Sequence, residues 1–264
     1  MCRHLAYLGP AVPIKTLVSD PPYGLLRQSW TPRRQRSGTL NADGFGIGWY
    51  VEDDPVPARY RRGIPMWSDE SFADLARVTR TRALLAAVRS ASAGMAPEAA
   101  AAAPYRDGPW LFSHNGRVEG WPGSMARLAA SLPAEALLEM EARVDSALLW
   151  ALVLHRLRAG TPPGVALETT VAEAAAAATG RYNFLLTDGR TIAATTYGDS
   201  LTYRTGDGSV LVASEEADED GGWIDVPDRS LLVATEHEVT ITPLPLPAEL
   251  VPSARSAPAR TEIR

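Results

Sequence analysis

Residues 1–10 are MCRHLAYLGP, and the second of them is the only cysteine in the chain. Leu5 and Tyr7 alternate with polar or small residues, which predicts a β-strand with Cys2 at its leading end. If Met1 is removed, Cys2 carries both a thiol and a free α-amino group, whose reference pKa is about 8. Such an amine can act as the base for a neighbouring nucleophile. The stretch therefore predicts a nucleophilic Cys2; the alternative is a small side chain tucked into an edge strand.

The composition is ordinary for a globular protein: 264 residues, 45% hydrophobic and 22% charged. A net charge of −5 gives no electrostatic reason to expect nucleic acid or an anionic membrane as partner. One cysteine excludes internal disulfides and multi-cysteine metal sites, and the four histidines show no metal-ligand spacing. From these residue types we expect neither a metal nor a cofactor. The sequence shows neither a signal peptide nor a membrane-spanning run, so we expect a cytoplasmic protein.

Strand-like and helix-like segments are not mixed evenly along the chain. Strand patterns dominate the first ninety or so residues, helical patterns dominate 133–180, and strands return after 180. This order favours an α+β architecture with two antiparallel sheets and packed helices, rather than a regular βαβ alternation. We expect one domain over 2–242. The proline- and alanine-rich residues 243–264 are typical of a disordered or loosely docked tail.

Two glycine-containing motifs are candidates for a site. In SHNGRVEG (113–120) the Asn115 amide and the Gly116 N–H could stabilise an oxyanion. The alternative is a hairpin, since Asn-Gly is a strong turn signal, and we expect two strands joined by a tight turn at HNG. In NADGFGIGWY (41–50) glycines within a strand suggest close approach of a ligand or backbone. We assign this strand to a pocket wall, with Asp43 as an orienting group.

Two charged side chains stand beside apolar segments. Arg89 ends the apolar stretch in AAVRSAS (86–92), where a guanidinium fork would suit a substrate carboxylate; the alternative is a salt bridge at a strand end. Asp145 begins the helical pattern in RVDSALLW (143–150) and could receive a substrate ammonium group. It could equally cap the helix, assisted by Ser146. His4 shares a strand face with Cys2 and is expected to be structural or to line the pocket.

The motifs occur in an order that resembles the class II glutamine amidotransferases, whose catalytic domain has the N-terminal-nucleophile hydrolase fold. The resemblance implies a four-layer αββα sandwich of two antiparallel sheets flanked by helices. It also implies Cys2 as nucleophile with its own α-amine as base, and Asn115 and Gly116 as the oxyanion pair. Arg89 would hold an α-carboxylate and Asp145 an α-ammonium. The residues expected to bind substrate are Arg89, Ser90, Ser92, His114 and Asp145.

This chain departs from the family pattern at two places. Ser92 stands where the family often has threonine, which keeps a hydroxyl, and the glutamate that often follows the aspartate motif is absent after Asp145 and Ser146. The second departure concerns the surroundings of the ammonium pocket more than the aspartate itself.

Within the family, MCRHLAYLG, GPWLFSHNGRVEGWP and LVASEEADEDGGW resemble the γ-glutamyl hydrolases of ergothioneine biosynthesis. This implies a small-molecule γ-glutamyl substrate, release of glutamate and hercynylcysteine S-oxide, and a functional link to other enzymes of that pathway. Hydrolysis is expected rather than amidotransfer, because the amidase domain takes up almost the whole chain. The alternatives are a glutaminase or glutathione-degrading amidase of the same fold, and a catalytically silent γ-glutamyl-binding module.

A trimethylated histidine in the substrate would favour aromatic or acidic walls around its quaternary ammonium. The acidic stretch SEEADED (214–220) and five tryptophans are candidates, although simple packing is the preferred interpretation for most of the rings. These tryptophans are Trp30, Trp49, Trp67, Trp121 and Trp223.

Overall fold

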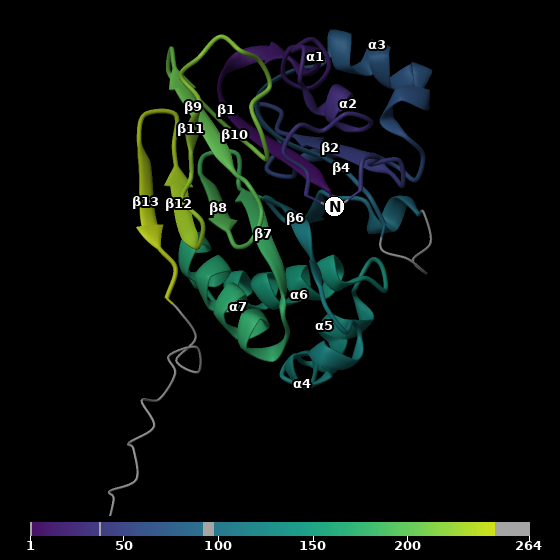
Figure 1. Ribbon diagram of the computed structural model, residues 1–264, viewed down its shortest axis with the longest axis vertical. Helices are drawn as coiled ribbons and strands as arrows, with labels where there is room; N and C mark the ends of the chain where they lie inside the picture. The colour runs from purple at the N-terminus through teal and green to yellow at the C-terminus, as the bar shows by residue number, and fades with distance from the viewer. Residues whose placement is uncertain (1, 37, 92–97, 246–264) are drawn as a thin grey trace, which may run out of the picture.

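Strand β1 (Arg3–Pro13) begins directly after Cys2 and runs through the middle of one of two antiparallel sheets (Figure 1). The computed structural model describes residues 2–36, 38–91 and 98–245. Along β1, Leu5 and Tyr7 pack against helices on the outer side, whereas Ala6 and Leu8 pack toward the second sheet. The alternating pattern at Leu5 and Tyr7 therefore forms a β-strand, as predicted, and the first part of this strand is buried on both faces.

The two sheets are named here sheet A and sheet B. Within the described residues, sheet A contains, in spatial order, β11 (Ile224–Asp225), β9 (Thr202–Gly206), β10 (Ser209–Ala213), β1, β4 (Arg80–Val88), β2 (Phe45–Trp49) and β3 (Ala58–Arg62). Sheet B contains β13 (Val239–Pro243), β12 (Ser230–Ala234), β8 (Ile192–Thr196), β7 (Gly180–Thr187), β6 (Trp110–Val118) and β5 (Tyr105–Asp107). The strand pairs of both sheets are antiparallel, as predicted.

Helices cover the outer face of each sheet, so the molecule has four layers (Figure 1). Sheet A is covered by α1 (Ile14–Val18), α2 (Leu25–Gln28) and α3 (Glu70–Val78). The helices on the sheet B side are α4 (Ala126–Ala129), α5 (Ala134–Leu138), α6 (Asp145–Arg158) and α7 (Pro163–Ala177). Short 3₁₀ turns lie at η1 (Met66–Ser68), η2 (Ala99–Ala101) and η3 (Gly123–Met125). The four-layer αββα arrangement implied by the family resemblance is thus present.

The prediction of a hairpin turn at HNG is wrong. Asn115 and Gly116 lie inside the continuous strand β6 and pair with Asn183 and Tyr182 of β7. β6 pairs with β7 from Leu111 to Val118, and this long ladder outweighs the local turn preference of Asn-Gly. Local side-chain chemistry does set the start of α3, where the Asp69 side chain caps the helix by accepting a hydrogen bond from the Phe72 N–H.

The close approach of a backbone that the β2 glycines predicted is present, although these glycines do not line the cavity described below. A Cβ at Gly46 would collide with the Ala103 carbonyl, and one at Gly48 would lie 2.6 Å from a methyl carbon of Leu111. These glycines therefore let β2 lie close to the 103–104 segment and to sheet B.

The C-terminal boundary predicted at 242 is close to the end of the last strand. Pro243 pairs with Ser230 at the end of β13, and Leu244 is buried in the core under the α6 and α7 helices. Most of the predicted tail, residues 246–264, lies outside the described residues, as do Met1 and Ser92. The division into domain and tail therefore stays a prediction. In the described part of the chain, none of the helices combines the length and apolarity needed to cross a membrane.

Candidate active site

Cys2 and Arg89 lie at the same end of sheet A because of the strand register. β1 and β4 are antiparallel with Arg3 opposite Val88, so the next residue outward on each strand is Cys2 or Arg89. Both line one cavity, and Cys2 is half-buried there. The polar residues that line it are Cys2, Arg89, Ser90, Tyr105, Ser113, His114, Asp145 and Ser146, with Gly116 among the remainder. The structure thus brings together most of the predicted site residues. Asn115 stands between two lining residues of β6 but does not itself line the cavity, and Ser92 lies outside the described residues.

The segment before β2 fixes Arg89 in place. The Arg89 N–H donates to the Gly44 carbonyl at 2.7 Å, and its own carbonyl accepts from the Asp43 N–H at 2.9 Å. The Asp43 carboxylate accepts from the Ala91 N–H at 2.8 Å, and the Arg89 guanidinium donates to the Asp43 carbonyl at 3.2 Å. Asp43 is therefore the orienting group that the sequence predicted. The guanidinium supplies a buried positive charge on one side of the cavity.

Asp145 supplies the negative charge on another wall. It is the first residue of α6, and its carboxylate accepts hydrogen bonds from the Val118 N–H at 3.0 Å and the Ser146 N–H at 2.8 Å. The first bond ties the start of α6 to the end of β6. Each carboxylate oxygen keeps a further lone pair, so a cationic group in the cavity can still be bound. The local helix-start role and the site role are therefore compatible.

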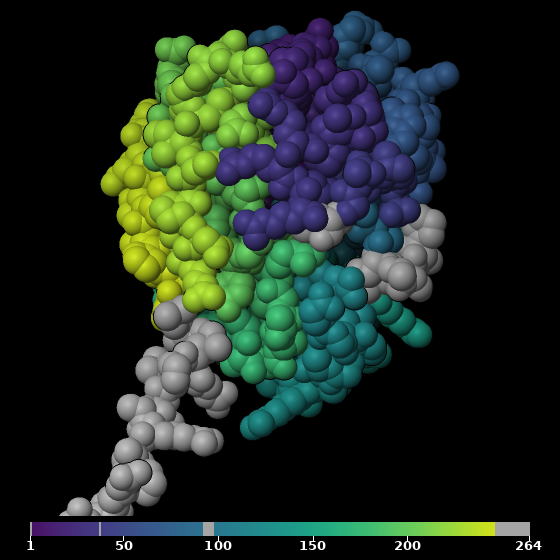
Figure 2. Space-filling model, in the orientation of Figure 1, coloured from purple at the N-terminus to yellow at the C-terminus, as the bar shows by residue number. Residues whose placement is uncertain are grey.

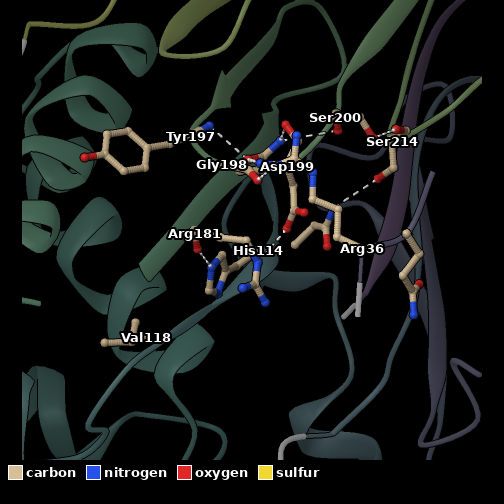
Figure 3. A network of polar contacts seen from close by, with 12 residues as sticks. Arg36, His114, Val118, Arg181, Tyr197, Gly198, Asp199, Ser200 and Ser214 are labelled. Carbon is tan, nitrogen blue, oxygen red and sulfur yellow. Dashed lines mark hydrogen bonds and ion pairs between the residues drawn. The ribbon is translucent and has the colours of Figure 1, made fainter. Parts of the chain in front are cut away.

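His114 is neutral and fully engaged within the protein. Its Nε2 lies 2.9 Å from the Arg181 carbonyl oxygen and must donate to it, so Nδ1, 2.9 Å from the Ser146 hydroxyl, accepts. Burial lowers the pKa of His114, which agrees with a neutral ring. His114 therefore forms a wall of the cavity and holds the Ser146 hydroxyl. Figure 3 shows the other side of the ring, where His114 faces Arg181. Its predicted contact with substrate stays a prediction.

Gly116 is required by the packing of its neighbours. A Cβ at this position would collide with the Arg181 carbonyl oxygen and with His114 Nε2, the two atoms joined by the hydrogen bond just described. Glycine thus leaves room for that bond on one side and exposes backbone to the cavity on the other.

Asn115 points in the opposite direction from His114, into the space between the sheets. Its Nδ2 donates to the Ser214 hydroxyl at 3.4 Å, and its Oδ1 is buried without a hydrogen-bond partner among the described residues. Ser113, on the same side of β6, lies 3.1 Å from Nδ1 of His4. Burial lowers the pKa of His4 to about 3. The sandwich is therefore polar at its Cys2 end, and His4 is a buried structural residue there.

A buried charged group lies behind this polar end. Asp199 is almost fully buried, and its carboxylate accepts from the Arg181 side chain at 3.0 Å (Figure 3). Burial raises the pKa of this carboxyl, while the nearby charges of Arg181 and Arg3 oppose the change. Arg3, next to Cys2, is itself fully buried. Sequence reasoning missed both residues, since a single Arg or Asp within strand and loop patterns carries no signal of burial.

Sequence reasoning also missed several residues that line the cavity. Tyr105 lies in β5, donates its hydroxyl to the Ala101 carbonyl at 3.3 Å, and is fully buried. Burial raises the pKa of Tyr105, so the phenol stays neutral. Ser113 and Ser146 stand directly beside predicted residues in the SHNG and VDS motifs, and their position within those motifs was the available signal.

The acidic segment 214–220 is occupied by contacts within the protein. Both oxygens of the buried Glu215 carboxylate accept backbone N–H groups, from Arg33 at 2.9 Å and Arg34 at 2.8 Å. Asp218 accepts from Arg204 and from the Trp223 ring N–H. The two hydrogen bonds of Glu215 hold the loop before β2, at Arg33 and Arg34, against the acidic segment. In Figure 2 this loop is purple-blue and lies beside the yellow-green part of the chain.

The candidate tryptophans are likewise engaged in packing. Arg204 lies over the Trp223 ring, 4.7 Å from its centroid, and Trp30 and Trp67 contact each other edge to face at 5.7 Å. Trp49 and Trp121 pack against the helix-covered cores. Packing, the preferred interpretation for most of these rings, is what their contacts support. In the described residues, no cluster of three or more His, Cys, Asp or Glu is arranged to hold a metal ion.

Comparison with known proteins yields a consistent set of matches. A family model for class II glutamine amidotransferases matches residues 24–205. A gamma-glutamyl-hercynylcysteine sulfoxide hydrolase from Mycolicibacterium smegmatis is 44% identical over 92% of this chain and all of its own length. The protein of the same name from Mycobacterium tuberculosis is also 44% identical, covering 92% of this chain and 97% of its own.

A solved structure supports the same fold. The class II glutamine aminotransferase domain protein from Silicibacter pomeroyi superposes with a TM-score of 0.66 at 21% identity, covering 92% of this chain and 99% of its own. At this identity the likeness concerns the fold alone.

Proposed function

This chain belongs to the class II glutamine amidotransferases, and we propose that it is a cysteine hydrolase acting on the γ-glutamyl amide of γ-glutamyl-hercynylcysteine sulfoxide. The products are glutamate and hercynylcysteine sulfoxide, and the reaction is a step of ergothioneine biosynthesis. The observation that carries the proposal is one cavity lined by the single thiol, one arginine and one aspartate. These three groups match the electrophilic carbonyl, carboxylate and ammonium of a γ-glutamyl group.

Recognition of the glutamyl moiety rests on opposite charges at fixed places. The Arg89 guanidinium, anchored by the Asp43 segment, binds the α-carboxylate. The Asp145 carboxylate, held by two backbone N–H groups, binds the α-ammonium. Ser90 lines the same wall and is proposed to contribute to this binding; Ser92 is proposed likewise, although it lies outside the described residues. The γ-carbonyl is thereby directed toward Cys2.

The chemistry proceeds through a glutamyl thioester. Removal of Met1 frees the α-amino group of Cys2, which takes the thiol proton, and the sulfur attacks the γ-carbonyl carbon. The Asn115 side-chain amide and the Gly116 N–H stabilise the resulting oxyanion. The C–N bond then breaks and the leaving amine takes the proton from the α-ammonium. Water, deprotonated by the same amine, attacks the thioester, which releases glutamate and restores the thiol.

The identity of the leaving group is inferred from the relatives. Two curated proteins of the stated name align over nearly their whole length with this chain at 44% identity. At that similarity and coverage, a shared substrate is better supported than plain glutaminase activity.

A substrate panel tests the proposal. The purified protein is incubated with γ-glutamyl-hercynylcysteine sulfoxide, glutamine or glutathione, and free glutamate is measured. We expect kcat/KM to be highest for the first compound by at least about tenfold, and activity to vanish in Cys2→Ala. Faster turnover of glutamine or glutathione would refute the assigned substrate, and undiminished activity in Cys2→Ala would refute the mechanism.

A further inference from the structure

The space between the two sheets changes character along β1. Away from Cys2 it is filled by apolar side chains such as Leu8, Leu85 and Leu111. At the Cys2 end it is filled by a buried polar cluster made of His4, Ser113, Asn115 and Ser214. Buried polar groups cost stability unless they are hydrogen-bonded, so this cluster needs a reason to exist. The proposed mechanism uses Asn115 and leaves Ser214, part of the LVASEE segment, without a role.

Ser214 is held in place at three points. Its N–H donates to the His4 carbonyl at 3.0 Å, and its carbonyl accepts from the Ser200 hydroxyl at 2.7 Å (Figure 3). Its hydroxyl accepts from the His4 N–H at 3.0 Å. The side chain is completely buried, and the next residue, Glu215, is tied to the Arg33 and Arg34 N–H groups. The Ser214 hydroxyl is therefore a fixed acceptor attached to the strand that carries the nucleophile.

The same hydroxyl contacts the proposed oxyanion donor. Asn115 Nδ2 donates one hydrogen to Ser214 Oγ at 3.4 Å. A primary amide has two N–H hydrogens on Nδ2, and fixing the direction of one fixes the amide plane and hence the direction of the other. Asn115 Oδ1 has no hydrogen-bond partner among the described residues, so on this side chain the orienting bond that the structure provides is the one to Ser214.

We propose that Ser214 is a positioning residue, whose hydroxyl holds the Asn115 amide so that its second N–H faces the oxyanion formed at the γ-carbonyl. The contact joins His4 of sheet A to Asn115 of sheet B through one oxygen atom. It therefore couples the position of the nucleophile strand to that of the oxyanion donor. Ser214 is not among the residues that line the cavity, and its proposed action on the reaction passes through the Asn115 amide. This inference rests on the proposed function of Asn115 in γ-glutamyl hydrolysis.

A double-mutant cycle tests the inference. Ser214→Ala is expected to lower kcat by about 3- to 10-fold, the size of one neutral hydrogen bond, with KM changed less than about twofold. Asn115→Ala is expected to lower kcat by about 10²- to 10³-fold. In the Asn115→Ala background, adding Ser214→Ala should change kcat by less than about twofold, because the group it positions is gone. An equal loss in both backgrounds, or none in the parent, would overturn the inference.

Two further variants separate positioning from packing. Ser200→Ala removes a hydroxyl from the same network without touching Asn115, and we expect its kcat to stay within about twofold of the parent. Ser214→Cys fills the site with a somewhat larger thiol that is only a weak hydrogen-bond acceptor, so it leaves no cavity and should still lower kcat by about 3- to 10-fold. A loss in Ser200→Ala as large as in Ser214→Ala would instead assign the effect to general packing.

A spectroscopic measurement is independent of the substrate. The side-chain amide signals of Asn115 in ¹⁵N-labelled protein are identified by their disappearance in Asn115→Ala. We expect slow exchange of one amide hydrogen with solvent in the parent and at least about tenfold faster exchange in Ser214→Ala. Unchanged exchange would overturn the positioning role whatever the enzyme hydrolyses. Absence of turnover in the parent, with exchange behaving as expected, would instead count against the proposed function.

Discussion

Replacing Gly116 by alanine should damage both the fold and the site, because the added methyl group has no space. The new Cβ would collide with His114 Nε2 and the Arg181 carbonyl oxygen, and would lie 2.7 Å from the Arg181 carbonyl carbon, where ordinary contact begins at 3.4 Å. β6 and β7 must therefore separate by well over half an ångström. Overpacking of this kind costs about 1–3 kcal/mol, and loss of the His114–Arg181 hydrogen bond adds about 1 kcal/mol.

Denaturant unfolding and steady-state kinetics measure the two consequences. We expect Gly116→Ala to lower the free energy of unfolding by about 3 kcal/mol, or the Tm by about 6–12 °C. We also expect kcat to fall by at least about 10²-fold, because the oxyanion donors shift with β6. The matched control is Gly123→Ala, where nothing lies within 4 Å of the added Cβ. If Gly116→Ala were as stable and active as Gly123→Ala, the steric reasoning would be refuted.

Three other predictions follow from the same contacts. Asp145→Asn should raise KM about 10- to 100-fold through loss of the charge that faces the ammonium; an unchanged KM in steady-state assays would contradict this. It should also lower the Tm by about 2–4 °C, because the amide oxygen can accept only one of the two N–H groups that the carboxylate binds. Arg89→Lys should raise KM by at least about tenfold, because an ammonium cannot reproduce the bidentate contact with a carboxylate; parent-like kinetics would argue against the assignment. Burial lowers the pKa of His4 from 6.5 to about 3, so the unfolded state takes up this proton first as the pH falls. The contribution of His4 to stability should therefore fall by about 1.4 kcal/mol per pH unit from about pH 6 toward pH 3. The lowered pKa of His114 adds a loss of the same sign, so urea titrations should show a smaller but not abolished slope in His4→Gln, and an unchanged slope would contradict the assignment.

Much of the fold was predictable because strand periodicity and helix signals act locally. The alternation at Leu5 and Tyr7 and the helical pattern after Asp145 both appear as elements in the structure. The four-layer arrangement came from the family resemblance, since local patterns do not say how two sheets stack. The HNG motif shows the opposite limit. Its turn preference is a local property, whereas the ladder with β7 that keeps it in a strand joins residues far apart in the sequence.

The site was predictable where each residue sits in a recognisable motif, and not where it depends on contacts between distant segments. Cys2, Arg89 and Asp145 belong to such motifs, and the register of β1 with β4 then places Cys2 and Arg89 at one end of the sheet. The contact of Asn115 with Ser214 spans 99 positions of sequence, and no periodicity encodes it. The requirement for glycine at 116 likewise depends on the Arg181 carbonyl of a different strand.

The most direct test of the central claim is the intact mass of the protein, before and during turnover. In rapidly quenched samples with γ-glutamyl-hercynylcysteine sulfoxide, we expect a chain that begins at Cys2 and a transient mass increase of one glutamyl group, located on the N-terminal peptide. An active protein that retains Met1, or a glutamyl adduct located elsewhere in the chain, would contradict the mechanism in which Cys2 is both nucleophile and source of the base.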